Sequence, residues 1–410
     1  MPEFLTLDDV NVEGKTVLVR VDFNSPVNPE TKKLLDDTRI RAHGETTLKE
    51  LSEKGAKVVV LAHQGRPGDP DFIPLKQHAE RLGELLGKPV KYIDDLYGEK
   101  AKQAIKELKN GEILVLENTR TYSEERKSKT PKEHAESEFI RELAPLADLF
   151  VNDAFSAAHR SHASVVGFTA VLPSVAGRIM ERELKALSRV LESPEKPCVF
   201  ILGGAKADDS LKISQYVLKN NIADYILTGG ITGHLFLVAS GVDLGEPNME
   251  LLKKQEVLNL VPGIKELMAE HPGKIKIPID VAVEVEGRRK ELSVEDLPTE
   301  YPIFDIGTKT INEYSRIIKE ANSIVVSGPP GVYEKEEFIK GTKGILEAVA
   351  NSEAFSLIGG GHTVAAVQEL GLSDKMSYIS TAGGALIEFL MGSRLPAVVA
   401  LEEVAKKKIA

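Results

Sequence analysis

Cysteine is almost absent from this chain: among its 410 residues, only Cys198 carries a thiol. A lone cysteine cannot form an intramolecular disulfide, so the sequence excludes a disulfide framework and fits a reducing compartment. The chain also lacks a run of about 18 apolar residues, the length that a membrane-spanning helix needs. Its acidic N-terminus has no apolar segment typical of a signal peptide. We therefore expect a cytoplasmic protein with no membrane partner.

An excess of positive charge is missing as well. The formal net charge is −10, which argues against a general nucleic-acid binder but leaves room for a local basic pocket that binds a small anion. Two common nucleotide motifs are also absent: no G-x-x-x-x-G-K-[ST] loop occurs, and no G-x-G-x-x-G follows a strand. The second absence disfavours a dinucleotide-dependent oxidoreductase.

What the chain does contain is a regular alternation of short apolar strands and amphipathic helices. It begins with "KTVLVRVDF", continues with helical stretches at 38–54 (Gly55 being the cap) and 76–86, and resumes after residue 195 with "KPCVFILGG". Continuous apolar strands separated by helices indicate parallel sheets covered on both faces. At 410 residues, two such sets predict an α/β protein with two doubly wound, Rossmann-like parallel-sheet domains.

The expected domains are residues 1–172 and 194–389, joined by a hinge helix over 173–193. In that segment Ile179, Leu184, Leu187 and Leu191 lie on one helical stripe. The tail from 390 to 410 reads as a further amphipathic helix, and the alternating stretch "VAVEVEGRRKELSV" predicts a hairpin in the second domain.

Basic and polar residues follow the strands of the first half. Ligands of open parallel sheets bind beyond the carboxyl ends of the strands, so these residues are expected to meet. One arginine there is usually a solvated side chain, but four arginines with two or three histidines predict a site for a multiply anionic ligand. The residues are Asp22, Asn24, Arg39, His63, Arg66, Arg120, His159, Arg160 and His162.

Glycines follow the strands of the second half, in "LGGAK", "TGGIT", "SGPPG", "GGGHT" and "STAGG". Glycine lets backbone amides approach phosphate oxygens, and a helix N-terminus adds a favourable dipole. We expect the glycines at 359–361 and 383–384 to cradle nucleotide phosphates. An anion domain facing a nucleotide domain suits phosphoryl transfer, which depends on positioning and charge neutralisation.

Eight ordered motifs then resemble one family across essentially the whole chain. The stretches "RVDFNSP", "HQGRP", "LENTR", "NDAFSAAHRSH", "LGGAK", "SGPPGVYE", "GGGHT" and "STAGGA" are similar to those of phosphoglycerate kinases, most closely archaeal ones. The resemblance implies reversible phosphoryl transfer between 1,3-bisphosphoglycerate with ADP and 3-phosphoglycerate with ATP, with Mg²⁺ bound to the nucleotide. It also implies a monomer whose domains close by hinge bending and whose C-terminal tail packs on the N-terminal domain.

The resemblance further implies roles for individual residues. Arg39, Lys206, Gly361 and Gly384 would be catalytic; Arg39 would span the acyl phosphate, and Lys206 would balance charge on the transferring group. The residues implied to bind phosphoglycerate are Asp22, Phe23, Asn24, Arg39, His63, Gln64, Gly65, Arg66, Arg120 and Arg160. Those implied to bind the nucleotide are Lys206, Lys212, Glu334, Gly360, Gly361, His362 and Thr363, with Glu334 on the ribose and Gly383 facing the phosphates beside Gly384.

Three positions depart from the family pattern. Ser210 stands where a second lysine is common, and Lys212 either replaces that lysine or is a surface residue. Ser327 stands where the family often has asparagine. His362 stands where most members have a magnesium-binding aspartate, which leaves the protein ligand of magnesium unknown. An imidazole is a poor Mg²⁺ ligand, so His362 is expected to contact nucleotide phosphates or to cap its helix.

Two further readings stay open at this point. One is a kinase for a different small acid on the same architecture. The other is a binding protein that has lost turnover, against which the presence of both Arg39 and Lys206 argues.

Overall fold

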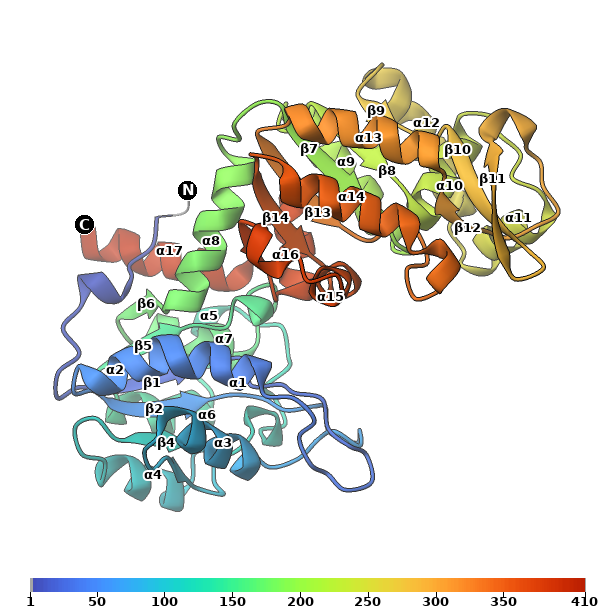
Figure 1. Cartoon of the computed structure of the whole chain (residues 1–410). Helices are drawn as coiled ribbons and strands as arrows, with labels where there is room; N and C mark the ends of the chain where they lie inside the picture. The colour runs from blue at the N-terminus through green and yellow to red at the C-terminus, as the bar shows by residue number, and fades with distance from the viewer. Residues whose placement is uncertain (1–2, 410) are drawn as a thin grey trace. The chain divides into compact units, whose positions relative to one another are not determined.

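The computed structural model describes residues 3–409 and divides the chain into two compact units (Figure 1). Unit 1 comprises Met1–Lys185 with Arg394–Ala410, and unit 2 comprises Ala186–Ser393. Each unit contains one six-stranded sheet in which all neighbouring strands run parallel. The predicted fold class, an α/β protein with two parallel-sheet domains, is confirmed.

The sheet of unit 1 has the strand order β3-β4-β2-β1-β5-β6. Its strands are β1 (Thr16–Arg20), β2 (Lys57–Leu61), β3 (Lys91–Tyr92), β4 (Ile113–Val115), β5 (Leu149–Asn152) and β6 (Ser174–Ala176). The helices of unit 1 are α1 (Thr38–His43), α2 (Lys49–Glu53), α3 (Lys76–Leu86), α4 (Glu99–Lys106), α5 (Pro131–Ala135), α6 (Glu138–Leu143), α7 (Ala163–Val166), the start of α8 (Arg178–Leu191) and α17 (Pro396–Ile409).

The sheet of unit 2 has the order β15-β14-β13-β7-β8-β9. Its strands are β7 (Cys198–Leu202), β8 (Tyr225–Thr228), β9 (Ile275–Lys276), β13 (Ser323–Ser327), β14 (Phe355–Gly359) and β15 (Tyr378–Ile379). The helices of unit 2 are α9 (Ala207–Lys219), α10 (Gly230–Ala239), α11 (Glu246–Lys254), α12 (Val261–Glu270), α13 (Thr308–Glu320), α14 (Lys340–Asn351), α15 (Gly361–Glu369) and α16 (Gly383–Leu390).

The continuous apolar runs of the central strands follow from burial on both faces. Along β1, Val17 and Val19 join one hydrophobic cluster, whereas Leu18 between them joins the cluster on the opposite face. Successive side chains of a strand point to opposite faces, so a strand with helices on both sides must be apolar at every position. This arrangement leaves only the ends of the strands free to carry polar chemistry.

The helix expected at 38–54 contains an irregular turn. Residues Gly44–Leu48 form a π-helical segment between α1 and α2, so the predicted helical stretch is confirmed with one π-helical turn inside it. Gly44 lies close to α3, because a Cβ there would be 2.7 Å from Leu82 Cδ1 and the leucine side chain would have to shift. The predicted end is confirmed, since Gly55 follows the helix with φ +81°.

The bridging helix also starts later than expected. Ser174–Ala176 pair in parallel with β5 as the edge strand β6, so the helical segment begins at Arg178 rather than at 173. The first turn of α8 is anchored within unit 1, because the Arg178 N–H donates to Thr47 Oγ1 at 2.9 Å and the Ile179 N–H donates to Asp153 Oδ1 at 2.9 Å. The boundary between the units falls inside α8, after Lys185.

Two smaller predictions concern the hairpin of unit 2 and the C-terminal helix. The predicted hairpin is confirmed: β10 (Asp280–Val285) pairs antiparallel with β11 (Arg288–Ser293), and β12 (Ile303–Ile306) adds a third strand. The C-terminal helix α17 belongs to unit 1, where it contacts α7 and β6 and buries Ala397 and Leu401 completely.

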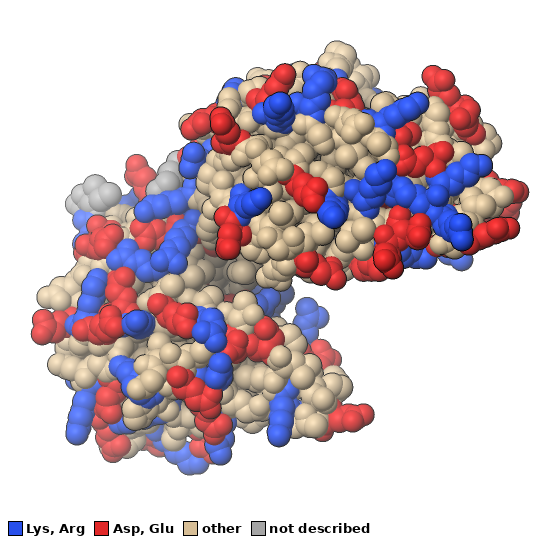
Figure 2. All heavy atoms as spheres, in the orientation of Figure 1, with Lys and Arg blue, Asp and Glu red and all other residues tan. Residues whose placement is uncertain are grey.

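The surface carries charges of both signs. On the face shown in Figure 2, basic and acidic side chains are interspersed over each unit. Within residues 3–409, no helix combines the length and apolarity needed to cross a membrane.

Candidate functional site

Arg39 and Asp22 form the centre of the polar residues in unit 1. Asp22 follows β1 and is buried, and both of its carboxylate oxygens lie near the Arg39 guanidinium: Nη1 is 3.2 Å from Oδ1 and 3.1 Å from Oδ2. The same nitrogen donates to the carbonyl of Asn24 at 3.1 Å. Ser156, in the loop after β5, donates its hydroxyl to the Asp22 carboxylate. One edge of the guanidinium is therefore fixed, while 39% of the Arg39 side chain stays accessible to a ligand.

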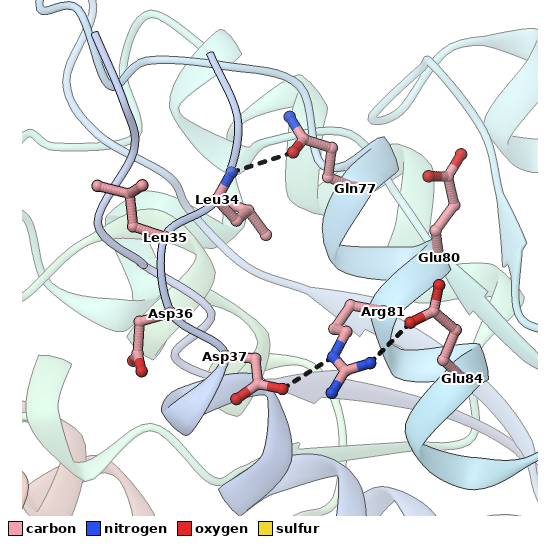
Figure 3. A pocket seen from close by; sticks show the side chains of 8 residues that line it. All are labelled: Leu34, Leu35, Asp36, Asp37, Gln77, Glu80, Arg81 and Glu84. Carbon is pink, nitrogen blue, oxygen red and sulfur yellow. Dashed lines mark hydrogen bonds and ion pairs between the residues drawn. The ribbon is translucent and has the colours of Figure 1, made fainter. Parts of the chain in front are cut away.

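The start of α1, which carries Arg39, is held from a second side. Asp37 immediately precedes α1, and its carboxylate accepts a hydrogen bond from Arg81 Nε of α3 at 2.8 Å (Figure 3). Arg81 also binds Glu84, and the N–H of Leu34 donates to Gln77, so the segment before α1 is tied to α3 along the wall of a surface cavity of about 410 Å³. These ties fix where the first turn of α1 begins.

A second group of contacts organises the loop after β2. The Gly65 N–H donates to Asn24 Oδ1 at 2.8 Å, and Arg120 Nη1 donates to the Gly65 carbonyl at 2.7 Å. Gly65 has φ +66°, and a Cβ there would lie 2.6 Å from the backbone of Asp71. Glycine is required at this position by the protein itself, and the turn draws Asn24 and Arg120 together.

Two of the expected phosphoglycerate ligands are buried with their side chains already engaged. Phe23 is fully buried and its ring lies parallel to that of His78, with centroids 6.4 Å apart. The Gln64 amide accepts from the Ser25 N–H and donates to the carbonyls of Ser25 and Asp71. These two side chains hold the loops in place, so any ligand contact at these positions comes from the main chain.

Arg20 is a member of the site that the sequence analysis did not single out. It is the last residue of β1, its side chain is almost completely buried, and it contacts His63 Nδ1 at 2.9 Å. Because the guanidinium can only donate, Nδ1 accepts and the ring proton lies on Nε2. Burial, followed by the charge of Arg20, holds the pKa of His63 well below its usual range. His63 is therefore neutral, with Nε2–H as its donor. An arginine inside an otherwise apolar strand was the signal that could have revealed Arg20.

Burial and mutual repulsion disfavour the charged forms of other basic residues in unit 1. Burial, followed by repulsion from Arg20 and Arg160, lowers the pKa of Arg120 to about 10. Burial and the charge of Arg160 lower the pKa of His162 to about 3. Arg120 Nε and His159 Nδ1 are buried without a hydrogen-bond partner in the described part of the chain. Buried polar groups are normally hydrogen-bonded, so this cluster is arranged for an anionic ligand.

The glycines that follow the strands of unit 2 fall into two groups with different surroundings. Gly203 and Gly328 pack backbone against backbone, since a Cβ on Gly328 would lie 2.2 Å from the Gly203 carbonyl oxygen. These glycines serve the packing of two turns. At Gly361 and Gly383, by contrast, an added Cβ would meet nothing within 4 Å. Those two begin α15 and α16, so open space lies over the two helix N-termini.

Thr363 links the two kinds of turn. Its hydroxyl oxygen accepts a hydrogen bond from the Gly328 N–H at 2.7 Å, and the side chain is buried in the first turn of α15. Gly360, with φ +86°, makes the turn from β14 into this helix. The hydroxyl proton of Thr363 stays available to a ligand.

His362 and Glu334 lie near each other at the surface. His362 Nδ1 is 3.8 Å from Glu334 Oε1, and the two side chains are 81% and 56% exposed. In residues 3–409, no three His, Cys, Asp or Glu side chains are arranged to hold a metal ion. A magnesium ion held by several protein side chains therefore finds no support around His362.

The two lysines of α9 differ in position. Lys206 is exposed and directly precedes the helix, next to the glycine turn after β7. Lys212 Nζ lies 3.1 Å from Asp208 Oδ2, and its side chain is 55% exposed. Ser210 is buried and accepts a hydrogen bond from Thr232 of α10 at 3.3 Å. Placing the charged lysine side chain at this buried position would be unfavourable, which is a physical reason for serine there.

The comparisons with known proteins all point to one family. A family model described as phosphoglycerate kinase matches residues 7–393. The phosphoglycerate kinase of Methanobacterium bryantii is 50% identical over 98% of both chains, and that of Methanothermobacter thermautotrophicus is 49% identical over 98% of this chain and 97% of its own. Among solved structures, the Pyrococcus horikoshii OT3 enzyme has a TM-score of 0.88 at 41% identity, and the Coxiella burnetii enzyme 0.85 at 34%; each match covers 98% of this chain and 100% of the other.

Proposed function

This chain belongs to the phosphoglycerate kinase family, and we propose that its two units divide the substrates of that reaction between them. The enzyme transfers a phosphoryl group reversibly between 1,3-bisphosphoglycerate with ADP and 3-phosphoglycerate with ATP, a step of glycolysis. Unit 1 takes the phosphoglycerate, and unit 2 takes the nucleotide. The observation that carries this assignment is the crowding of basic side chains in unit 1, where Arg120 lies beside Arg20 and Arg160 and its buried Nε has no hydrogen-bond partner.

In unit 1, the phosphate and carboxylate of 3-phosphoglycerate fit the fork of Arg120 and the donors of Arg66, Arg160 and His63. Asp22 and Asn24 are already engaged by Arg39 and Gly65, so they orient these donors and accept from the substrate hydroxyl. Arg39 then neutralises charge on the acyl phosphate as it forms. Because that charge is largest in the transition state, Arg39 acts mainly on turnover.

In unit 2, the open N-terminus of α15, with Gly360, Gly361 and Thr363, takes the nucleotide phosphates. Gly383 and Gly384 offer the N-terminus of α16 in the same way, and the absence of any atom within 4 Å of a Cβ at Gly383 supports this. Glu334 accepts from the ribose hydroxyls. Lys206 balances the charge of the transferring group.

Magnesium enters this reaction as the complex with ATP or ADP. Mg²⁺ prefers oxygen ligands and keeps several waters, so the nucleotide phosphates hold it without a protein cage. We assign His362 to the phosphates, to which its ring donates a hydrogen bond in either protonation state. The protein works in the cytoplasm as a monomer, without a nucleic-acid or membrane partner.

The division of substrates is tested by calorimetric titration of two variants with each substrate. Arg120→Ala is expected to weaken 3-phosphoglycerate binding at least tenfold and to leave MgATP binding unchanged. Arg141→Ala, an exposed arginine of α6, is the matched control. Equal 3-phosphoglycerate affinity in Arg120→Ala and the parent would refute the assignment to unit 1.

The charge-balancing role is tested by kinetics of Lys206→Ala and Lys212→Ala at matched magnesium concentrations. Lys206→Ala is expected to be the more strongly impaired. If Lys212 has taken over the missing second-lysine role, both variants lose most of their activity. Normal turnover in Lys206→Ala would contradict the charge-balancing role of Lys206. In the same assay, other small acids are offered in place of 3-phosphoglycerate, and a lack of activity with them excludes a different acceptor.

A further inference from the structure

His43 is a buried histidine to which neither the sequence nor the reaction gives a role. It is the last residue of α1, and both of its ring nitrogens have partners. The backbone N–H of Asp22 donates to Nε2 at 3.2 Å, and Nδ1 lies 2.6 Å from Asp153 Oδ2. Because Nε2 accepts, Nδ1 carries the proton and donates to Asp153. The ring is thus a neutral bridge with one defined tautomer.

On the far side of this bridge lies the first turn of α8. The other oxygen of Asp153, Oδ1, accepts from the Ile179 N–H at 2.9 Å, and the Asp153 side chain is completely buried. The same stretch of chain that carries His43 contacts α8 twice more. Thr47 Oγ1 accepts from the Arg178 N–H, and the carboxylate of Glu50 binds the Arg178 guanidinium at 2.9 and 3.1 Å.

On the near side lies the catalytic arginine. The Asp22 residue whose N–H binds His43 is the one whose carboxylate holds Arg39 Nη1. Arg39 and His43 are four residues apart, so they lie on the same face of α1. A continuous series of hydrogen bonds therefore runs from the α8 backbone through Asp153, His43 and Asp22 to the Arg39 guanidinium.

We propose that His43 is a positioning residue, which fixes the Asp22–Arg39 pair relative to the first turn of α8. It touches no substrate. Asp153, His43 and Asp22 are all buried. In a close-packed interior, a displacement of one of these side chains displaces the side chains that it contacts. Since α8 is the helix in which unit 1 ends and unit 2 begins, the position of Arg39 depends on the seating of that helix. The inference rests on the proposed catalytic role of Arg39.

The test is a double-mutant cycle in steady-state kinetics. His43→Leu removes both hydrogen bonds and is expected to lower kcat about tenfold to 100-fold, because small displacements of a catalytic group are costly. The KM for 3-phosphoglycerate is expected to change less than threefold. His43→Gln, whose amide offers one donor and one acceptor, is expected to recover most of the loss. In an Arg39→Ala background, His43→Leu is expected to change kcat less than twofold.

The controls separate positioning from loss of stability. Leu143→Ala removes a buried side chain of α6 outside this series, so it is expected to lower the melting temperature and keep the parental kcat. If His43→Leu does not fold, Asp153→Asn enters the same cycle with the same expectations. A folded variant with kcat within twofold of the parent, or a further tenfold loss in the Arg39→Ala background, would overturn the inference. Parental activity in Arg39→Ala alone would instead refute the proposed role of Arg39.

Discussion

Arg39 is held at one nitrogen and accessible along the rest of its side chain. We expect Arg39→Ala to lower kcat by about 10²- to 10³-fold, the usual order for removing a donor that stabilises transition-state charge. Binding of 3-phosphoglycerate should stay measurable by calorimetry, because Arg66, Arg120 and Arg160 remain. Arg41→Ala, two residues along α1 and paired with Glu45, is the control. Turnover within threefold of the parent would rule out the assignment of Arg39.

His78 makes the stability of the protein depend on pH. Burial lowers its pKa to about 4, whereas an unfolded chain has a histidine pKa of about 6.5. Between these values the unfolded chain binds a proton that folded His78 does not, so the free energy of unfolding falls as the pH falls through this range. The full loss from this residue is roughly 3 kcal/mol. The contribution is complete above pH 6.5 and is lost toward pH 4.

Urea unfolding at several pH values checks this expectation. His78→Leu should have a free energy of unfolding that decreases less steeply between pH 7 and pH 4.5 than that of the parent. Leu82→Val, on the same helix and without a titratable group, should lower stability equally at each pH. Parallel curves for His78→Leu and the parent would contradict the prediction.

For single residues, the sequence indicated which basic and polar side chains follow the strands of unit 1, but not what each side chain contacts. Arg120 and His63 could be anticipated because cationic residues after parallel strands must gather at one edge. Phe23 and Gln64 belong to the same motifs, but their side chains are engaged within the protein. The Phe23 side chain is buried, and the Gln64 amide donates hydrogen bonds to loop carbonyls. His43 could not be anticipated at all, since its partner Asp153 is 110 positions away in the sequence.

The N-terminus of α15 is the element at which the role of His362 can be tested. The ring is largely exposed there, so His362→Ala is expected to weaken nucleotide binding only a few-fold and to leave the magnesium requirement intact. His362→Asp supplies a carboxylate oxygen and is expected to lower the magnesium concentration for half-maximal activity. A magnesium titration at saturating 3-phosphoglycerate measures both effects. A nucleotide complex with a ring nitrogen about 2.0–2.2 Å from the metal would overturn the assignment.

The C-terminal helix α17 is an element on which unit 1 depends. Leu401 is completely buried where α17 packs in unit 1, so Leu401→Ala is expected to cost about 2–5 kcal/mol of unfolding free energy. Glu403→Ala, an exposed position of the same helix, should stay within about 0.5 kcal/mol of the parent. Urea unfolding followed by circular dichroism measures both. A Leu401→Ala variant as stable as Glu403→Ala would show that this packing contributes little.

Helices and strands could be predicted where the spacing of their own apolar residues defines them. The bounds of α3 and the β10–β11 hairpin follow from helical spacing and from strict alternation. The π-helical turn at Gly44 depends on how closely α3 approaches, and β6 depends on a free edge beside β5. Both are set by tertiary neighbours that a local window does not contain.

For the whole molecule, the proposed division of the two substrates between the units leads to a test in solution. Direct phosphoryl transfer requires the two substrates to touch, so units that each hold one substrate must close over both. Small-angle scattering is expected to show a smaller radius of gyration with 3-phosphoglycerate and nucleotide together than with either alone. Because product release would reopen the enzyme, a non-transferable ATP analogue should be used. An unchanged radius of gyration at saturation by both would count against hinge bending.

Unit 1 is built from two stretches of sequence separated by all of unit 2. On the ribosome, residues 1–185 emerge long before α17 exists, and at synthesis rates of about 5–20 residues per second unit 2 takes roughly 10 to 40 s to follow. During that interval the surface of α7 and β6 that α17 covers is exposed. Unit 1 is therefore the first to be synthesised and the last to be completed, and a chain that ends at residue 393 contains all of unit 2 but lacks the helix α17 of unit 1.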